Sequence, residues 1–196
     1  MLAVEPTQNG ERRVIVKKEA ELPVVYLAWH VPNHRSNDAP ALEVLSTILS
    51  GGRASRLYRD LVYQRQLALE AGGDYSYFAL DPNLFWFWAT PMPGQTPETL
   101  EAELAKQMER LKTEPVTDEE LARAKNQIES AFVLQEDSVH RRAALLARFE
   151  LIGGYVQKGL LHDQDPRGDR RRPDSRGGRL VRAERKSVGV LLPKPR

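Results

Sequence analysis

The chain has 196 residues, of which 41% are hydrophobic and 29% are charged, which suits one globular domain of ordinary size. Cysteine is absent, which excludes a disulfide framework and a cysteine nucleophile or metal ligand. No apolar stretch reaches the roughly 18 residues of a membrane-spanning helix, no secretory leader follows Met1, and the net charge of +2 comes with no nucleic-acid motif, so we expect neither a membrane span nor a nucleic-acid partner.

Hydrophobic periodicity and turn residues predict an α+β domain with a mainly antiparallel sheet and helices packed on one face. The run at residues 24–31 is nearly all apolar, which predicts a strand covered on both faces. Thr117 and Glu120 have the spacing of a capping box at a helix start. The expected elements are, in chain order, strands 12–18 and 24–31, helices 38–50 and 55–66, strands 74–80 and 84–90 joined by a turn at 81–83, and helices starting at 96, 117 and 138.

Several stretches carry a resemblance to a known family over residues 5–155. They are GERRVIVKKEAELP from Gly10, YLAWHVP from Tyr26, DAPALEVLSTILSGG from Asp38, SRLYRDLV from Ser55 and TDEELARAKNQIES from Thr117. Together they resemble the C-terminal, non-catalytic half of the insulinase (pitrilysin-type, M16) zinc metallopeptidases, with a LuxS/M16 metallohydrolase-like fold. The resemblance implies a linker at 1–10, an M16 C-terminal-type domain at 11–157, and a final strand and tail at 186–196.

The resemblance implies that zinc belongs to a partner catalytic half. That half binds the metal through an inverted H-x-x-E-H motif, which this chain lacks. The counterpart helix here is residues 38–50, with Glu43 in the glutamate place but Pro40 and Val44 where histidines would stand. We therefore expect no catalytic residue and no metal ligand in this chain, so that the chain alone is inactive although its family consists of metalloendopeptidases.

The two histidines nearest in sequence, His30 and His34, have a four-residue spacing that suits zinc only when both lie on one helix. Pro32 lies between them and separates a strand residue from a loop residue. This pair is therefore expected to bind no metal.

The resemblance also implies an arginine and a tyrosine that hold the substrate backbone. Val62 and Leu69 fill those places here. Tyr63, Arg65 and Tyr75 lie close enough in sequence to substitute, and they are the substrate-binding candidates. The alternative is that both tyrosines are packing residues and that Arg65 is a solvated charge.

Two functions follow from the resemblance. The first is the C-terminal half of a zinc peptidase, which closes the wall of the proteolytic chamber and contributes to peptide binding beside a catalytic half or subunit with H-x-x-E-H. The alternative is a non-catalytic scaffold that acts only by protein association. Because many relatives in this family are exported, the resemblance implies a periplasmic location, and the alternative is the cytoplasm. The sequence does not indicate the substrate or the oligomeric state.

Residues 158–185 break the preceding pattern, with eight arginines against five acidic residues between Gly159 and Arg185. Such composition cannot bury a core, so the segment is expected to be disordered or out of frame. Family members continue here with a stretch like KIRAVTAEDL and an amphipathic helix. Codons for Asp163 to Asp169, read one nucleotide later, can encode TKIRAVT. DNA sequencing across these codons would check for a local double frameshift.

Overall fold

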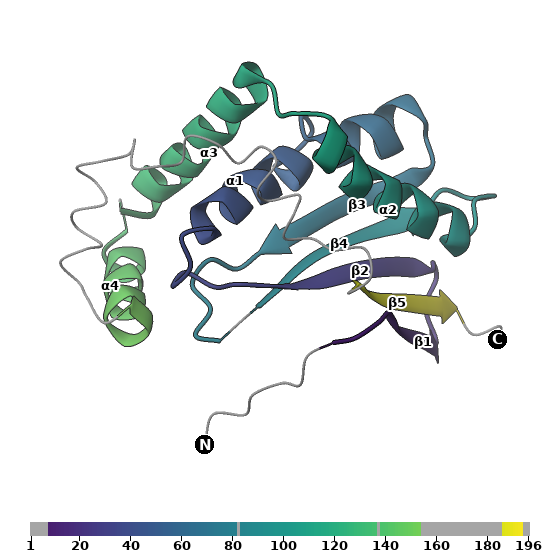
Figure 1. Ribbon diagram of the computed structural model, residues 1–196, viewed down its shortest axis with the longest axis horizontal. Coiled ribbons are helices and arrows are strands. Elements are labelled where there is room, and N and C mark those ends of the chain that lie inside the picture. Colours follow the sequence, from purple (N-terminus) through teal and green to yellow (C-terminus); the bar gives the residue numbers. More distant parts are fainter. Residues whose placement is uncertain (1–7, 82, 137, 154–185, 194–196) are drawn as a thin grey trace.

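The computed structural model describes residues 8–81, 83–136, 138–153 and 186–193, and it shows a five-stranded sheet with helices on one side (Figure 1). The strand order is β1-β5-β2-β4-β3. Only β1 and β5 pair in parallel, and the other neighbouring strands are antiparallel. This arrangement confirms the predicted α+β class. The strands are β1 (Arg12–Lys18), β2 (Val24–Val31), β3 (Ala68–Tyr75), β4 (Asn83–Pro91) and β5 (Lys186–Pro193).

The sheet buries one face. Along β2, Val25, Leu27 and Trp29 are buried, whereas Tyr26 on the opposite face is exposed. The buried side chains of β2 pair with those of β4 that face the helices, namely Phe85, Phe87 and Ala89. The expectation of a strand covered on both faces was therefore wrong, because aromatic residues at the exposed positions hid the alternation.

The third strand lies earlier than expected, at Ala68–Tyr75 instead of residues 74–80. Glycines are depleted in strands, so Gly72 and Gly73 hid it from the propensity argument. The structure needs glycine there because β4 presents large rings to both positions. A Cβ on Gly72 would lie 3.0 Å from the indole nitrogen of Trp88, and one on Gly73 would collide with the ring of Phe87.

Helices form two layers above the buried face (Figure 1). The inner layer consists of α1 (Ala39–Ser50), which packs on β3, and α2 (Pro97–Thr113), which packs on β2 and β4. In the outer layer α3 (Asp118–Glu136) packs on α1 and is followed by α4 (Val139–Arg148) and a short π-helix, η2 (Phe149–Gly153). The second predicted helix is present as the π-helix η1 (Tyr58–Gln64). No described helix is long and apolar enough to cross a membrane.

The two signature stretches SRLY and TDEEL meet in space. Arg56 of the first donates two hydrogen bonds of 2.7 Å to the carboxylate of Glu120 in the second. Glu120 also accepts from the Thr117 amide at 3.0 Å, and the Glu120 amide donates to the Thr117 hydroxyl at 3.2 Å, which confirms the capping box. One carboxylate therefore caps α3 and attaches it to the segment before η1.

The final strand lies in the sheet as predicted. Val188 and Val190 of β5 are buried under the helices, between β1 and β2. Gln8, in the expected linker, is buried and donates to the Lys186 carbonyl at 3.0 Å. Residues 158–185, for which we expect a frameshift, lie outside the described residues, and β5 begins directly after them. The frameshift remains a proposal.

Candidate functional site

Helix α1 contains Pro40 and Val44, the residues that the resemblance places where zinc-binding histidines would stand. Pro40 lies in its first turn, and Val44 is almost fully buried against Ala124 of α3. Neither side chain can bind a metal ion, so the residues present do not fit zinc at this helix. No group of three His, Cys, Asp or Glu side chains among the described residues could hold a metal ion.

The histidines do not converge. His30 lies on β2, on the face away from the helices. His34 lies in the following loop, where its Nδ1 is 3.1 Å from the Ala79 carbonyl. The neighbouring Asn33 donates to the Leu80 carbonyl at 2.8 Å, so both side chains fasten the loop before α1 to the segment after β3.

Arg65, just after η1, is held by acidic side chains. It donates to Glu103 of α2 at 2.6 Å and lies 3.4 Å from Asp60. The hydrogen bond to Arg65 lowers the pKa of Glu103 below its ordinary value. This arrangement joins η1 to α2, as a structural ion pair would.

Tyr63 and Tyr75 have opposite surroundings. Tyr63 on η1 is 74% exposed, whereas Tyr75 at the end of β3 is buried with its ring edge-on to Phe85. The Tyr75 hydroxyl donates to the Pro32 carbonyl at 2.7 Å, and burial raises its pKa above the ordinary value. The structure thus does not bring the three candidates together: Tyr75 packs in the core, Arg65 is paired, and Tyr63 alone presents its ring to solvent.

The sheet surface opposite the helices carries a band of apolar side chains that the sequence analysis did not single out. Tyr26 is 42% exposed and Leu84 37%, and the Tyr26 and Trp86 ring centroids are 6.1 Å apart. No described helix covers this band. We call it the free face, and it consists of Val14 and Val16 of β1, Tyr26 of β2, and Leu84, Trp86 and Trp88 of β4.

Two glycines add no side chain to the free face. Gly189 of β5 lies beside Tyr26, and Gly72 of β3 lies opposite Trp88. Exposed apolar surface of this kind marks an interaction site more often than an isolated exposed side chain does. The LFWFWAT stretch was the available signal, because its tryptophans alternate with buried phenylalanines and must point to the other face.

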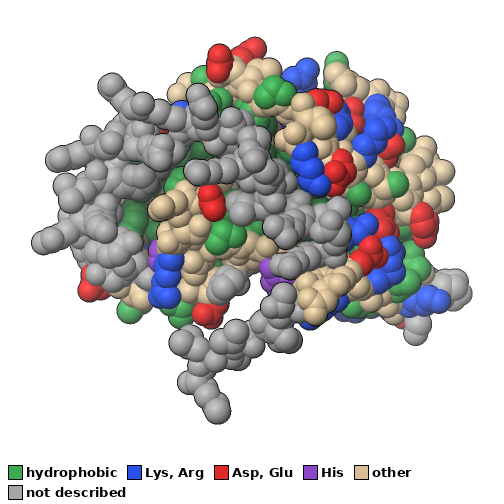
Figure 2. Space-filling model, viewed as in Figure 1, with side chains coloured by type: hydrophobic (Ala, Val, Ile, Leu, Met, Phe, Trp, Pro, Cys, Tyr) green, Lys and Arg blue, Asp and Glu red, His purple; other side chains and the backbone are tan. Residues whose placement is uncertain are grey.

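Among the described residues drawn in Figure 2, charged side chains of both signs are visible. On the surface drawn in Figure 2, basic and acidic side chains are interspersed on the side of the molecule where α2 lies. Several of them are paired, as in the contacts of Lys186 with Glu11 at 3.3 Å and with Glu101 at 3.7 Å. Surfaces that bind nucleic acid concentrate basic charge. That this chain has no nucleic-acid partner stays a prediction.

The fold is an α+β domain with helices on one side of a five-stranded sheet. Residues 2–128 match the family model described as the peptidase M16 inactive domain. The chain therefore belongs to the M16 peptidase family, by its inactive domain, as the sequence resemblance predicted.

Named relatives agree with this assignment. The chain is 32% identical over 146 residues to the zinc protease PqqE of Helicobacter pylori, a match that covers 74% of this chain and 33% of that protein. It is 29% identical over 147 residues to an uncharacterized zinc protease of Mycobacterium bovis, again with 74% and 33% covered. The chain thus spans about a third of the length of the curated relatives it matches.

Solved structures show the same fold. A protease from Helicobacter pylori superimposes with a TM-score of 0.81 at 27% identity, over 96% of this chain and 46% of that one. The inactive peptidase domain of a Bordetella parapertussis protein superimposes with a TM-score of 0.77 at 24% identity, over 92% of this chain and 97% of that domain. The second comparison shows that the fold occurs as a domain of about this extent.

Proposed function

We propose that this chain is the C-terminal, non-catalytic wall of a two-part M16 zinc peptidase. A partner half that carries H-x-x-E-H supplies the zinc, and the free face of this chain contacts the unfolded peptide substrate inside the closed chamber. The chain covers only a third of its named zinc-protease relatives, which leaves length for a catalytic half. In this arrangement the zinc is bound in the partner half, and the substrate is cleaved there.

The free face is the observation that carries the proposal. A surface of exposed and half-buried aromatic and aliphatic side chains suits an extended chain whose apolar residues are accessible. Tyr26 and Trp86 form its centre, since they lie diagonally across adjacent strands with their ring centroids 6.1 Å apart. Contact between such a face and peptide would exclude water from the chamber without any catalytic group on this side.

The first test is reconstitution. The purified chain is expected to bind no stoichiometric zinc and to cleave no peptide, whereas addition of a separately expressed M16 half with H-x-x-E-H should produce chelator-sensitive cleavage. Metal analysis after dialysis and hydrolysis of an unstructured fluorogenic peptide measure both results. Tight one-to-one zinc in this chain with activity of its own would contradict the proposal. Association without any cleavage would favour the scaffold alternative.

The free face should determine how strongly the reconstituted peptidase uses its substrate. The double variant Tyr26→Ala/Trp86→Ala is expected to lower kcat/KM about thirtyfold, because it removes two aromatic contacts each worth about 1 kcal/mol. Val139→Ala is the matched control, since Val139 is 88% exposed but lies on α4. The two halves are mixed at saturation, so that weaker association is measured separately. Unchanged kcat/KM in the double variant would remove the free face from substrate binding.

Tyr63 remains a proposed substrate contact that can be tested in the same system. Because its side chain is mostly exposed, Tyr63→Ala should leave the free energy of unfolding within about 0.5 kcal/mol of the wild type. A rise in KM with unchanged stability would support contact with the peptide. Arg65→Ala, in contrast, is expected to lower stability slightly through the lost pair with Glu103. Unchanged kinetics for Tyr63→Ala would leave it as a surface residue.

A further inference from the structure

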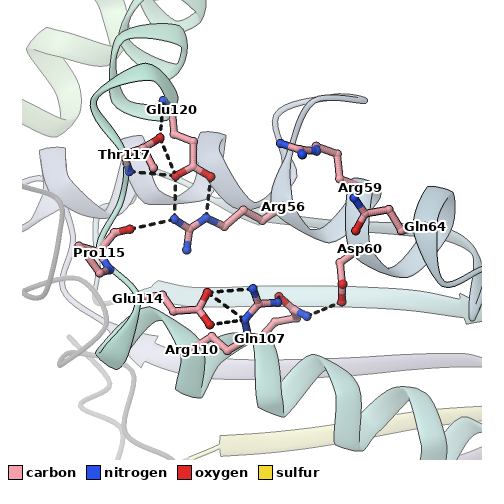
Figure 3. Close-up of a pocket in the computed structure, with 10 residues that line it drawn as sticks. All are labelled: Arg56, Arg59, Asp60, Gln64, Gln107, Arg110, Glu114, Pro115, Thr117 and Glu120. Carbon is pink, nitrogen blue, oxygen red and sulfur yellow. Dashed lines mark hydrogen bonds and ion pairs between the residues drawn. The ribbon is translucent and has the colours of Figure 1, made fainter.

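A polar pocket of about 300 Å³ lies on the helical side of the molecule, away from the free face (Figure 3). Its walls come from η1 and the residues before it, from the C-terminal half of α2, and from the start of α3. The volume is at the lower end of the range for small-molecule sites. Its lining residues are Arg56, Arg59, Asp60, Gln64, Gln107, Arg110, Glu114, Pro115, Thr117 and Glu120.

Every carboxylate that lines the pocket already has donors. Glu120 accepts two hydrogen bonds from Arg56, and Glu114 accepts from Arg110 at 2.8 and 2.9 Å. Asp60 accepts from Gln107 at 2.6 Å. These pairs hold the walls in place and leave no carboxylate in need of a bound cation.

The unused groups of the pocket are donors. Arg59 and Gln64 are drawn on the η1 side in Figure 3, and no dashed line reaches either side chain. Within the described part of the chain, neither side chain makes a hydrogen bond or ion pair. A guanidinium presents five N–H donors in a planar fork that matches the oxygens of a carboxylate or a phosphate. An oxyanion is therefore the ligand that this set of groups would bind.

The backbone that presents these donors is unusual. Arg59, Asp60 and Gln64 belong to a seven-residue π-helix, whose wider turns are rare and occur frequently at functional sites. Two residues later Gln66 has a φ of +49°, which is uncommon for a residue other than glycine. Residues in such sparsely populated backbone conformations cluster at active sites and ligand sites, where the surrounding structure holds them in place.

We propose that this pocket binds a small oxyanion, a carboxylate or a phosphate group, between the Arg59 guanidinium and the Gln64 amide. The pairs Arg56–Glu120 and Arg110–Glu114 fix the opposite wall. A bound anion would join η1 to the connection between α2 and α3. This site lies on the helical side of the sheet, opposite the free face, and it does not depend on the proposed function.

Thermal unfolding of the full chain tests the site without any catalytic half. The additives are sodium phosphate, N-acetylglycine and its neutral analogue N-acetylglycinamide, each against sodium chloride at equal ionic strength. At about ten times its Kd, a bound anion should raise Tm by roughly 3 °C, and the amide should not. A shift with phosphate alone assigns the site to phosphate groups, and a shift with N-acetylglycine assigns it to carboxylates.

Arg59→Gln should abolish the shift, whereas Arg53→Gln should keep it, because Arg53 is a neighbouring exposed arginine outside the pocket lining. Circular dichroism of Arg59→Gln distinguishes a lost site from a lost fold. The proposal is overturned if neither anion shifts Tm, or if the shift persists undiminished in folded Arg59→Gln.

Discussion

Replacement of Gly73 by alanine is expected to lower the free energy of unfolding by about 3 kcal/mol. A Cβ at this position would collide with the Phe87 ring and lie 2.8 Å from the Trp86 carbonyl oxygen. The ring cannot move aside easily, because Phe87 is fully buried and contacts Trp29 and Phe85 edge-on. The strain must therefore be relieved by a shift of the β3 backbone away from β4. Urea unfolding monitored by tryptophan fluorescence would measure the loss.

Gly189→Ala provides the matched control in the same sheet. An added Cβ there would lie 3.6 Å from the Cβ of Tyr26, which is an ordinary van der Waals contact. We expect a change within about 0.5 kcal/mol, of either sign. Equal effects of the two substitutions would show that loss of backbone freedom, and not the clash with Phe87, sets the cost at Gly73.

Arg56→Ala should destabilise the chain by about 2 kcal/mol at neutral pH, and the difference from the wild type should shrink in acid. The hydrogen bonds from Arg56 are the main cause that lowers the pKa of Glu120 to about 2, from an ordinary value of 4.5. A lowered carboxyl pKa stabilises the folded state above pH 4.5, and this contribution is lost as the pH falls towards 2. Unfolding measured at pH 7, 4 and 2.5 for both proteins would check the trend.

The control for this prediction is Arg110→Ala. Arg110 pairs with Glu114 four residues along α2, but both side chains are much more exposed than those of Arg56 and Glu120. An exposed pair of this kind contributes little to stability, so Arg110→Ala should lower the free energy of unfolding much less than Arg56→Ala does. A pH-independent difference between Arg56→Ala and the wild type would mean that Arg56 acts through the Pro115 carbonyl, 3.2 Å away, and not through Glu120.

The elements that the sequence predicted well are those whose signals are local. The capping box at Thr117 and the helix that begins with Pro97 both depend on neighbours within a few residues, whereas β5 was expected from the family resemblance. The beginning of β3 could not be predicted, because its glycines make sense only beside the rings of a strand that follows later in the chain. Propensity assigns such glycines to turns.

Site residues were harder to predict than elements. Spacing placed Tyr63, Arg65 and Tyr75 close together in the sequence, but spacing carries no information on which way each side chain points. Tyr75 lies within the core, and Arg65 has an acidic partner on a helix that begins about thirty residues later. The free face could not be predicted without knowing which strands are neighbours in the sheet. The sequence does not show that β5 lies between β1 and β2, because β5 is far from both in the chain.

The position of β5 has a consequence for how the domain folds during synthesis. Within the described residues, β1 pairs only with β5, and more than 160 residues separate the two strands in the chain. While the chain is being made, β2, β4 and β3 can pair early, but β1 must wait for the last strand to leave the ribosome. Until then both β1 and the adjoining edge of β2 offer unpaired backbone groups to other chains. Nascent or truncated forms that end before Lys186 should therefore depend on chaperones far more than the finished domain does.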